Sequence, residues 1–157
     1  MPEPSQESGP GSEAGSERGR ALLPFGVAEV TGPSMVPTLR HGDQLLVHYG
    51  ARLGVGDVLV LRHPFQQDLL VVKRIAERRE GGWWVLGDNA YAGGDSTDYG
   101  VVPDELVLGK VRFRYRPRPR PRPADGQRSP FALARWALSA ARPVFGDRSA
   151  SRRLRAR

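Results

Sequence analysis

The segment DVLVLRHPFQQDLLVVKRIAERREGGWWVL, residues 57–86, consists of short β-branched and aromatic runs separated by Gly, Pro and Asp. Such runs are typical of strands joined by turns. They predict strands at Asp57–Arg62, Leu69–Ala76 and Trp83–Leu86, with residues 79–82 forming a hairpin turn between the last two. No stretch between them can supply the helical crossovers that an α/β sheet requires. The segment therefore favours a mainly β fold.

The same pattern continues on both sides of this segment. Further strands are predicted at Gly26–Thr31, Gln44–Tyr49 and Leu106–Tyr115, and helix signals are nearly absent between them. Many short strands at close spacing are typical of a small closed or half-closed β-barrel. We therefore expect a mainly β fold of the small-barrel kind.

The length of 157 residues supports one ordinary domain, which we expect over residues 25–116. Residues 1–24 are predicted to be a disordered leader, because the first twenty lack aromatic and β-branched residues and cannot offset their ordering entropy. Residues 117–157 are predicted to be a Pro/Arg-rich tail. It begins with an extended Arg-Pro spacer and has one short helix at 131–142.

The positive charge is confined to the end of the chain. Residues 111–157 hold fourteen Arg and two acids, whereas residues 1–110 hold more acids than bases, so the predicted domain is not a nucleic-acid surface. We interpret the tail as a solvated extension, with contact to an anionic membrane or an acidic partner as the open alternative. Because no leader resembles a signal peptide and the tail helix is too short to span a bilayer, a cytoplasmic enzyme without a transmembrane span is expected.

The composition also limits the chemistry. The chain has no cysteine, which excludes a thiol nucleophile, a disulfide framework and thiolate metal sites. Its three histidines are scattered along the sequence, so neither a metal site nor a cofactor is expected.

The segment Thr31-Gly32-Pro33-Ser34-Met35-Val36-Pro37-Thr38-Leu39 places a serine just after a predicted strand and a Gly-Pro turn. Gly32 permits close approach of the backbone to a substrate, and the two prolines fix local φ, so the loop would present the Ser34 hydroxyl rigidly. A serine hydroxyl is inert at neutral pH unless a neighbouring base accepts its proton.

Lysine is the better candidate for that base. None of the histidines, His41, His48 and His63, lies in a triad signature, and of the 24 basic side chains only Lys73 and Lys110 are not arginine, which stays protonated. Strand alternation places Lys73 with Leu69, Val71 and Ile75, where desolvation can lower a lysine pKa by about 3–5 units. The competing interpretation is a charged strand end formed by Lys73 and Arg74.

Three ordered blocks resemble the signal peptidase I family and its S26/S24 relatives. They are Ser34 to Leu39, Lys73-Arg74, and Gly87-Asp88-Asn89 with Asp95-Ser96, and the resemblance spans about residues 26–112. It implies a signal-peptidase-like β-barrel and a serine endopeptidase with a Ser-Lys dyad.

The resemblance also implies roles for individual residues. Ser34 would be the nucleophile and Lys73 the base, while the Ser34 N–H would form the oxyanion site, with Gly32 and Met35 beside the cleft. Structural support is implied for Gly87, Asp88, Asn89, Asp95 and Ser96. Two hydroxyl residues that many members carry are replaced here by Gly32 and Gly93, and Thr97 stands where the family usually has arginine.

Within this family, residues 28–30 and 94–100 resemble the nickel-type superoxide dismutase maturation proteases. That resemblance implies removal of an N-terminal propeptide from the dismutase precursor, so the nickel belongs to the protein substrate. Two alternatives stay open: a type I signal peptidase acting on exported preproteins, and a non-enzymatic module that binds through its Arg-rich tail.

Overall fold

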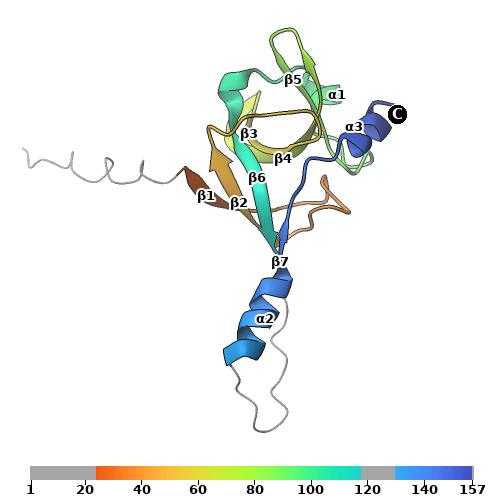
Figure 1. The fold of residues 1–157 in the computed structure, drawn as a ribbon. Coiled ribbons are helices and arrows are strands. Elements are labelled where there is room, and N and C mark those ends of the chain that lie inside the picture. The colour runs from red at the N-terminus through yellow and green to blue at the C-terminus, as the bar shows by residue number, and fades with distance from the viewer. Residues whose placement is uncertain (1–23, 118–129, 157) are drawn as a thin grey trace, which may run out of the picture.

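One antiparallel sheet forms most of the molecule. The computed structural model describes residues 24–117 and 130–156, and Figure 1 shows its strands wrapped into a curved sheet. The strand order is β1(Phe25–Glu29), β2(Gln44–Tyr49), β6(Val107–Tyr115), β3(Val58–His63), β4(Gln66–Arg79) and β5(Gly82–Leu86), and β7(Ala141–Pro143) pairs with β6. The mainly β fold expected from the sequence is confirmed.

All six predicted strands are present, with small differences at their ends. The largest difference is β4, which begins at Gln66 and ends at Arg79 instead of covering only Leu69–Ala76. Its polar ends extend because Gln66 pairs with His63 of β3 and Arg79 pairs with Gly82 of β5. Main-chain pairing therefore continues beyond the hydrophobic run that marks the strand in the sequence.

Short helices were not predicted inside the domain. The structure contains α1(Ser96–Tyr99) and a 3₁₀ turn at Asp104–Leu106, then α2(Pro130–Ala140) and α3(Arg148–Arg155) near the end of the chain. The first two are too short to show a helical period, and α3 is too rich in Arg and Ser to show an apolar one. Over the described residues, none of the helices combines the length and apolar character needed to cross a bilayer.

Strand β3 lies at the centre and separates two hydrophobic clusters. Val58 and Val60 belong to the first cluster, which also contains Met35 and Leu39 from the loop after β1. Leu59 and Leu61 belong to the second, with Ile75, Val85, Tyr99 and Val102. Because alternate residues of β3 enter different clusters, both of its faces are buried. This explains why its sequence is continuously apolar.

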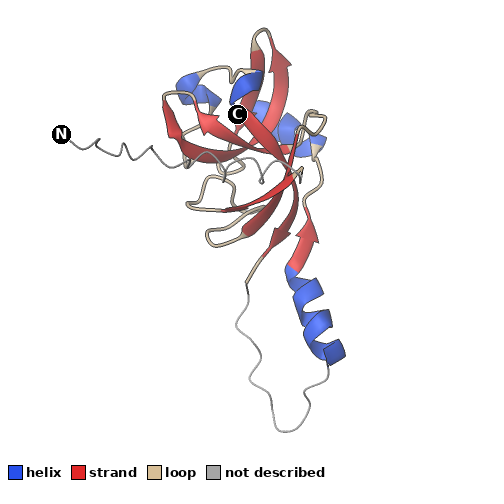
Figure 2. Cartoon of the chain, turned by 90° about the vertical axis from the view of Figure 1, so that its left-hand side faces the viewer, coloured by secondary structure: helices blue, strands red, loops and turns tan. Residues whose placement is uncertain are grey.

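Part of the chain beyond residue 116, which was predicted to be a tail, pairs with the sheet. Ala141, Arg142 and Pro143 of β7 pair with Tyr115, Arg114 and Phe113 of β6. Beyond β7, Val144 packs against the first hydrophobic cluster, and α3 contacts β4. Figures 1 and 2 show α2 projecting from the sheet and the following chain returning to it. The predicted leader and Arg-Pro spacer lie outside the described residues, except at their last and first positions.

A chain that ends at Pro117 should be less stable than the whole chain. The deletion removes Val144 from the first cluster and the β7 pairing from β6, which predicts a loss of at least about 1 kcal/mol, or about 4–8 °C in Tm for a domain of this size. Circular dichroism during heating measures this effect. Leu138→Ser, on the exposed surface of α2, is the control and should melt with the wild type. Equal Tm values for the truncated and whole chains would show that the returning segment adds no stability.

Candidate active site

The Ser34 loop is anchored by two buried side chains. Met35 and Leu39 are 1% and 0% exposed, and the Leu39 N–H donates to the Met35 carbonyl at 2.8 Å. Ser34 lies next to the first anchor and remains partly exposed. The Met35 side chain therefore packs into the first hydrophobic cluster. The loop holds Ser34 at the surface by burying its neighbours.

Gly32 serves the loop through its backbone conformation. Its φ of 87° lies in the left-handed region, where a residue with a side chain is strained. A Cβ at this position would meet no atom within 4 Å, so the space itself does not require glycine. Gly32 turns the chain from β1 into the Ser34 loop.

The segment after β5 contacts the Ser34 loop backbone to backbone. The Asn89 N–H donates to the Ser34 carbonyl at 2.9 Å, and Asn89 Nδ2 donates to the Pro33 carbonyl at 3.3 Å. A Cβ on Gly87 would lie 2.7 Å from the Ser34 carbonyl oxygen, so only glycine permits this approach. Within the described residues, the Ser34 N–H has no acceptor.

Lys73 lies on β4, opposite Leu59 of β3, and is only 3% exposed. Val71 and Ile75 share its side of the strand and pack in the second hydrophobic cluster. Leu69, which was expected among these neighbours, is 45% exposed near the outer end of β4, so it does not shield the amine. The burial of Lys73 comes from the second cluster.

Burial lowers the pKa of Lys73 below its usual 10.5, and the charges of Asp95 and Asp98 partly oppose that shift. Lys73 Nζ lies 3.5 Å from the Gly93 carbonyl oxygen. Gly93 stands where many family members have a hydroxyl residue, and here its main-chain carbonyl, not a side chain, contacts the Lys73 amine. Asp98 was not identified from the sequence, although its position one helical turn after Asp95 was a usable signal.

Asp95 and Ser96 fix the segment that contacts both Ser34 and Lys73. Asp95 caps α1 by accepting from Thr97 N–H and Oγ1 at 3.0 and 2.7 Å, and its second oxygen accepts from the Gly87 N–H at 3.0 Å. Ser96 Oγ accepts from the Val85 N–H at 2.9 Å. These side chains connect α1 to the end of β5.

A buried ion pair supports the same region from the other side of β4. Arg74 donates from Nε and Nη2 to the two oxygens of Asp88 at 2.8 and 2.7 Å, and the side chains are 3% and 7% exposed. Arg74 Nη1 also donates to the Gly56 carbonyl at 2.7 Å, while Thr38 Oγ1 donates to Asp88 at 2.5 Å. Sequence analysis singled out Asp88 but gave no role to Arg74 or Thr38.

The structure brings Ser34 and Lys73 to one segment, residues 87–95. Ser34 contacts its beginning through Asn89, and Lys73 contacts its end through Gly93. In the part of the chain that the structure describes, no hydrogen bond joins Ser34 Oγ to Lys73 Nζ.

The histidines occupy other places. His48 stacks on Phe25 and His63 packs against Tyr99, and among the described residues none of the three contacts Ser34 by a hydrogen bond or a ring contact. The described ranges also contain no group of three His, Cys, Asp or Glu residues that could hold a metal ion.

The residues of this candidate site lie within a match to a known family of peptidases. Residues 23–98, which include Ser34, Lys73, Asp88 and Asp95, match the Peptidase S24-like family model. The chain is 34% identical to the mitochondrial ATP-independent inner membrane protease subunit 1a of Arabidopsis thaliana, over 52% of this chain and 64% of that protein. It is 33% identical to the mitochondrial inner membrane protease subunit 1 of Schizosaccharomyces pombe, over 55% and 71%.

The corresponding subunit 1 of Xenopus tropicalis is 29% identical, over 52% of this chain and 63% of its own length. The chain thus spans slightly less than two thirds of the Arabidopsis and Xenopus relatives. The family model covers the Ser34 loop, the Lys73 strand and the supporting segment as one unit. The chain belongs to the S24/S26 signal peptidase-like family of peptidases.

Proposed function

We propose that the protein is a serine endopeptidase in which Lys73 is the base for Ser34. The observation that carries this proposal is the environment of Lys73. Lys73 is only 3% exposed beside the second hydrophobic cluster, and burial lowers its pKa, so its neutral form is accessible closer to physiological pH than that of a solvated lysine. A charged strand end, the competing interpretation, would leave the amine in water.

The proposed reaction follows from the groups present. Ser34 Oγ attacks the scissile carbonyl carbon as its proton passes to neutral Lys73 Nζ, giving a tetrahedral intermediate whose oxyanion accepts from the Ser34 N–H. Collapse breaks the C–N bond, and the Lys73 ammonium returns the proton to the leaving amine. Water then attacks the acyl-enzyme, again through Lys73, and releases Ser34 and the carboxylic acid product.

In the proposed mechanism, rotation about χ1 of Ser34 brings its hydroxyl to the Lys73 amine when the substrate binds. Among the described residues Ser34 Oγ has no hydrogen-bond partner that this rotation would break. Catalytic hydrogen bonds also commonly tighten only when the substrate is bound. The fixed backbone between Gly87 and Asp95 keeps the serine loop and the lysine strand in register during this step.

For the substrate, we propose the N-terminal propeptide of a nickel superoxide dismutase precursor, cleaved in the cytoplasm. Support comes from the resemblance of residues 28–30 and 94–100 to the maturation proteases of that enzyme. A type I signal peptidase acting on exported preproteins is the second candidate. It is favoured by the relatives, which are named as inner membrane proteases, and by the exposed Phe131 and Leu138 on α2.

Coexpression distinguishes these two substrates. The full chain is produced with a tagged dismutase precursor or with an exported preprotein, and the intact mass of each substrate is measured, with Ser34→Ala as the matched control. Loss of the propeptide mass only with the Ser34 protein supports dismutase maturation. Cleavage of the preprotein alone favours the signal peptidase. If neither substrate is cut, the non-enzymatic module that binds through its Arg-rich tail becomes the favoured alternative. In that case the whole chain should bind an acidic partner and the chain ending at Pro117 should not.

A further inference from the structure

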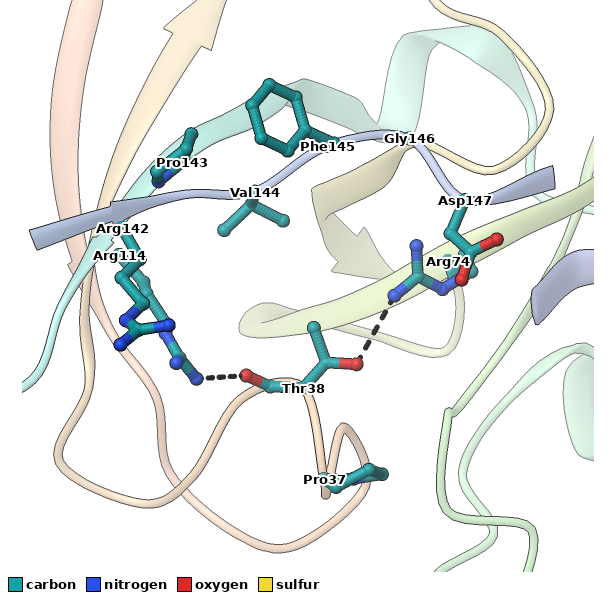
Figure 3. Close-up of a pocket in the computed structure, with 10 residues that line it drawn as sticks. All are labelled: Pro37, Thr38, Arg74, Arg114, Arg142, Pro143, Val144, Phe145, Gly146 and Asp147. Carbon is teal, nitrogen blue, oxygen red and sulfur yellow. Dashed lines mark hydrogen bonds between the residues drawn. The ribbon is translucent and has the colours of Figure 1, made fainter. Parts of the chain in front are cut away.

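A pocket of about 560 Å³ lies between the Ser34 loop and the returning C-terminal segment. Its walls come from Pro37 and Thr38 of the loop, Arg74 of β4, Arg114 of β6 and residues 142–147. Figure 3 shows the side chains of Arg114 and Arg142 at one end of the pocket, and Arg74 and Asp147 at the other. The pocket exists only because the C-terminal segment returns to the sheet.

The two charged ends of this pocket differ. At the Arg74 end, Arg74 is neutralised by Asp88. One oxygen of Asp147 accepts from Ser149 N, Ser149 Oγ and Ala150 N, and the other lies 3.6 Å from Arg153. The charges at this end already have partners inside the protein.

At the other end, positive charge is in excess. Asp43 is the acid of this end, and Arg116 occupies both of its oxygens at 2.7 and 2.8 Å. Arg114 reaches Asp43 only at 3.9 Å and otherwise donates to the Thr38 carbonyl, while the Arg142 guanidinium has no hydrogen bond or ion pair with any described residue. Among the described residues, the Asp43 carboxylate thus pairs with Arg116 and, at longer range, with Arg114, and the Arg142 guanidinium has no carboxylate partner.

The sheet register places two of these groups face to face. Arg114 of β6 and Arg142 of β7 are direct cross-strand partners in an antiparallel pair. Like charges at directly opposite positions destabilise a sheet, because their Cβ atoms lie only about 4.5–5.5 Å apart. Burial, together with the nearby cations Arg116, Arg142 and Arg40, accordingly lowers the pKa of Arg114. An anion between the two guanidinium groups would remove this repulsion.

We propose that this pocket binds an oxyanion, a phosphate or a carboxylate group, between the guanidinium groups of Arg114 and Arg142. Guanidinium groups form paired, charge-assisted hydrogen bonds with both kinds of oxyanion. The ligand is either a free anion or an acidic side chain of a bound polypeptide. Because Thr38 lies only four residues after Ser34 and its carbonyl accepts from Arg114, an anion here acts on the Ser34 loop.

Inorganic phosphate is the probe for the first test. The thermal unfolding of the full chain is measured as phosphate replaces chloride at constant ionic strength. Phosphate should raise the Tm of the wild type above its value in chloride, since a ligand at tenfold its Kd lowers the unfolding constant by about tenfold. Arg142→Gln should lose this response, and in chloride it should melt above the wild type because the repulsion is gone.

Arg62→Gln is the matched control. Arg62 is an exposed arginine of the same sheet, and its side chain donates to the Gln67 carbonyl and lies outside the pocket, so this variant should respond to phosphate as the wild type does. Equal Tm values in phosphate and chloride for the wild type, or an undiminished response in Arg142→Gln, would overturn the proposal. So would a lower Tm of Arg142→Gln in chloride, because Arg142 would then stabilise the sheet without an anion.

A second arm separates the two sources of the anion. A Glu-containing peptide and its Gln counterpart are titrated into the wild type and into Arg142→Gln by calorimetry, with and without phosphate. Binding of the Glu peptide alone, lost in Arg142→Gln and weakened by phosphate, assigns the pocket to acidic side chains. Phosphate binding without peptide binding assigns it to free anions. Neither result depends on peptidase activity, so both can be obtained with Ser34→Ala.

Discussion

Replacing Lys73 with Met is expected to abolish peptide cleavage and to leave a folded chain that melts no lower than the wild type. The base contributes about 10²–10⁴-fold to such a reaction, and Met cannot accept a proton. Met has nearly the shape of Lys, and it places no amine beside Val71 and Ile75, so the desolvation penalty disappears. Activity and stability should therefore change in opposite directions.

The stability of the wild type should also depend on pH through Lys73. Because the pKa of Lys73 is lowered in the folded state, the unfolded chain binds more protons between that lowered pKa and 10.5. The desolvation penalty that Lys73 imposes on the stability of the fold is thus complete below the lowered pKa of the folded state, and it disappears as the pH rises toward 10.5. Wild-type stability should rise with pH across this window. The advantage of Lys73→Met should be largest below it.

Cleavage should follow the same ionisation. The rate should rise with pH as Lys73 loses its proton, with an apparent pKa below 10.5. Ser34→Ala and Lys73→Arg should be as inactive as Lys73→Met. Lys73→Arg should be inactive because arginine keeps its proton. Initial rates on a fluorogenic peptide and chemical denaturation from pH 6 to 10 provide both measurements. Substantial turnover by Lys73→Arg would exclude Lys73 as the base.

Much of this fold could be predicted from local pattern. Each strand is marked by its own β-branched run, and the continuous apolar run of β3 reports that both of its faces are buried. The returning C-terminal segment could not be found in this way. This segment is held to the sheet by Val144 and by main-chain hydrogen bonds to β6. Main-chain hydrogen bonds leave no mark in the sequence, and the Arg-rich composition around Val144 is typical of a solvated tail.

In the candidate site too, local sequence identifies some residues and misses those whose role depends on distant partners. Ser34 and Lys73 could be identified because each is chemically unusual where it stands, a serine in a rigid turn and a lysine on an apolar strand. The roles of Arg74 and Thr38 could not. They depend on Asp88, 14 residues from Arg74 and 50 residues from Thr38, and nothing local shows which arginine of this Arg-rich chain a buried aspartate will meet.

Asp88→Asn should be among the most destabilising single changes in the domain. The variant keeps the shape of the side chain but leaves the Arg74 guanidinium 3% exposed without a counter-charge, and breaking one side of a buried pair costs about 3–5 kcal/mol. For a domain of this size that is at least about 12 °C in Tm. Calorimetry measures it. The control is Asp104→Asn, which breaks the exposed pair with Arg78 and should melt close to the wild type.

The double variant Arg74→Met/Asp88→Leu separates charge burial from loop anchoring. With both charges removed, most of the lost stability should return, because apolar side chains of similar volume replace a desolvated pair. Cleavage should nevertheless be reduced in the double variant, since Thr38 loses the carboxylate that anchors the Ser34 loop to β4. Restored Tm with restored turnover would show that the ion pair only stabilises the fold. A double variant no more stable than Asp88→Asn would show that the hydrogen bond from Arg74 to the Gly56 carbonyl, not the paired charge, holds this region together.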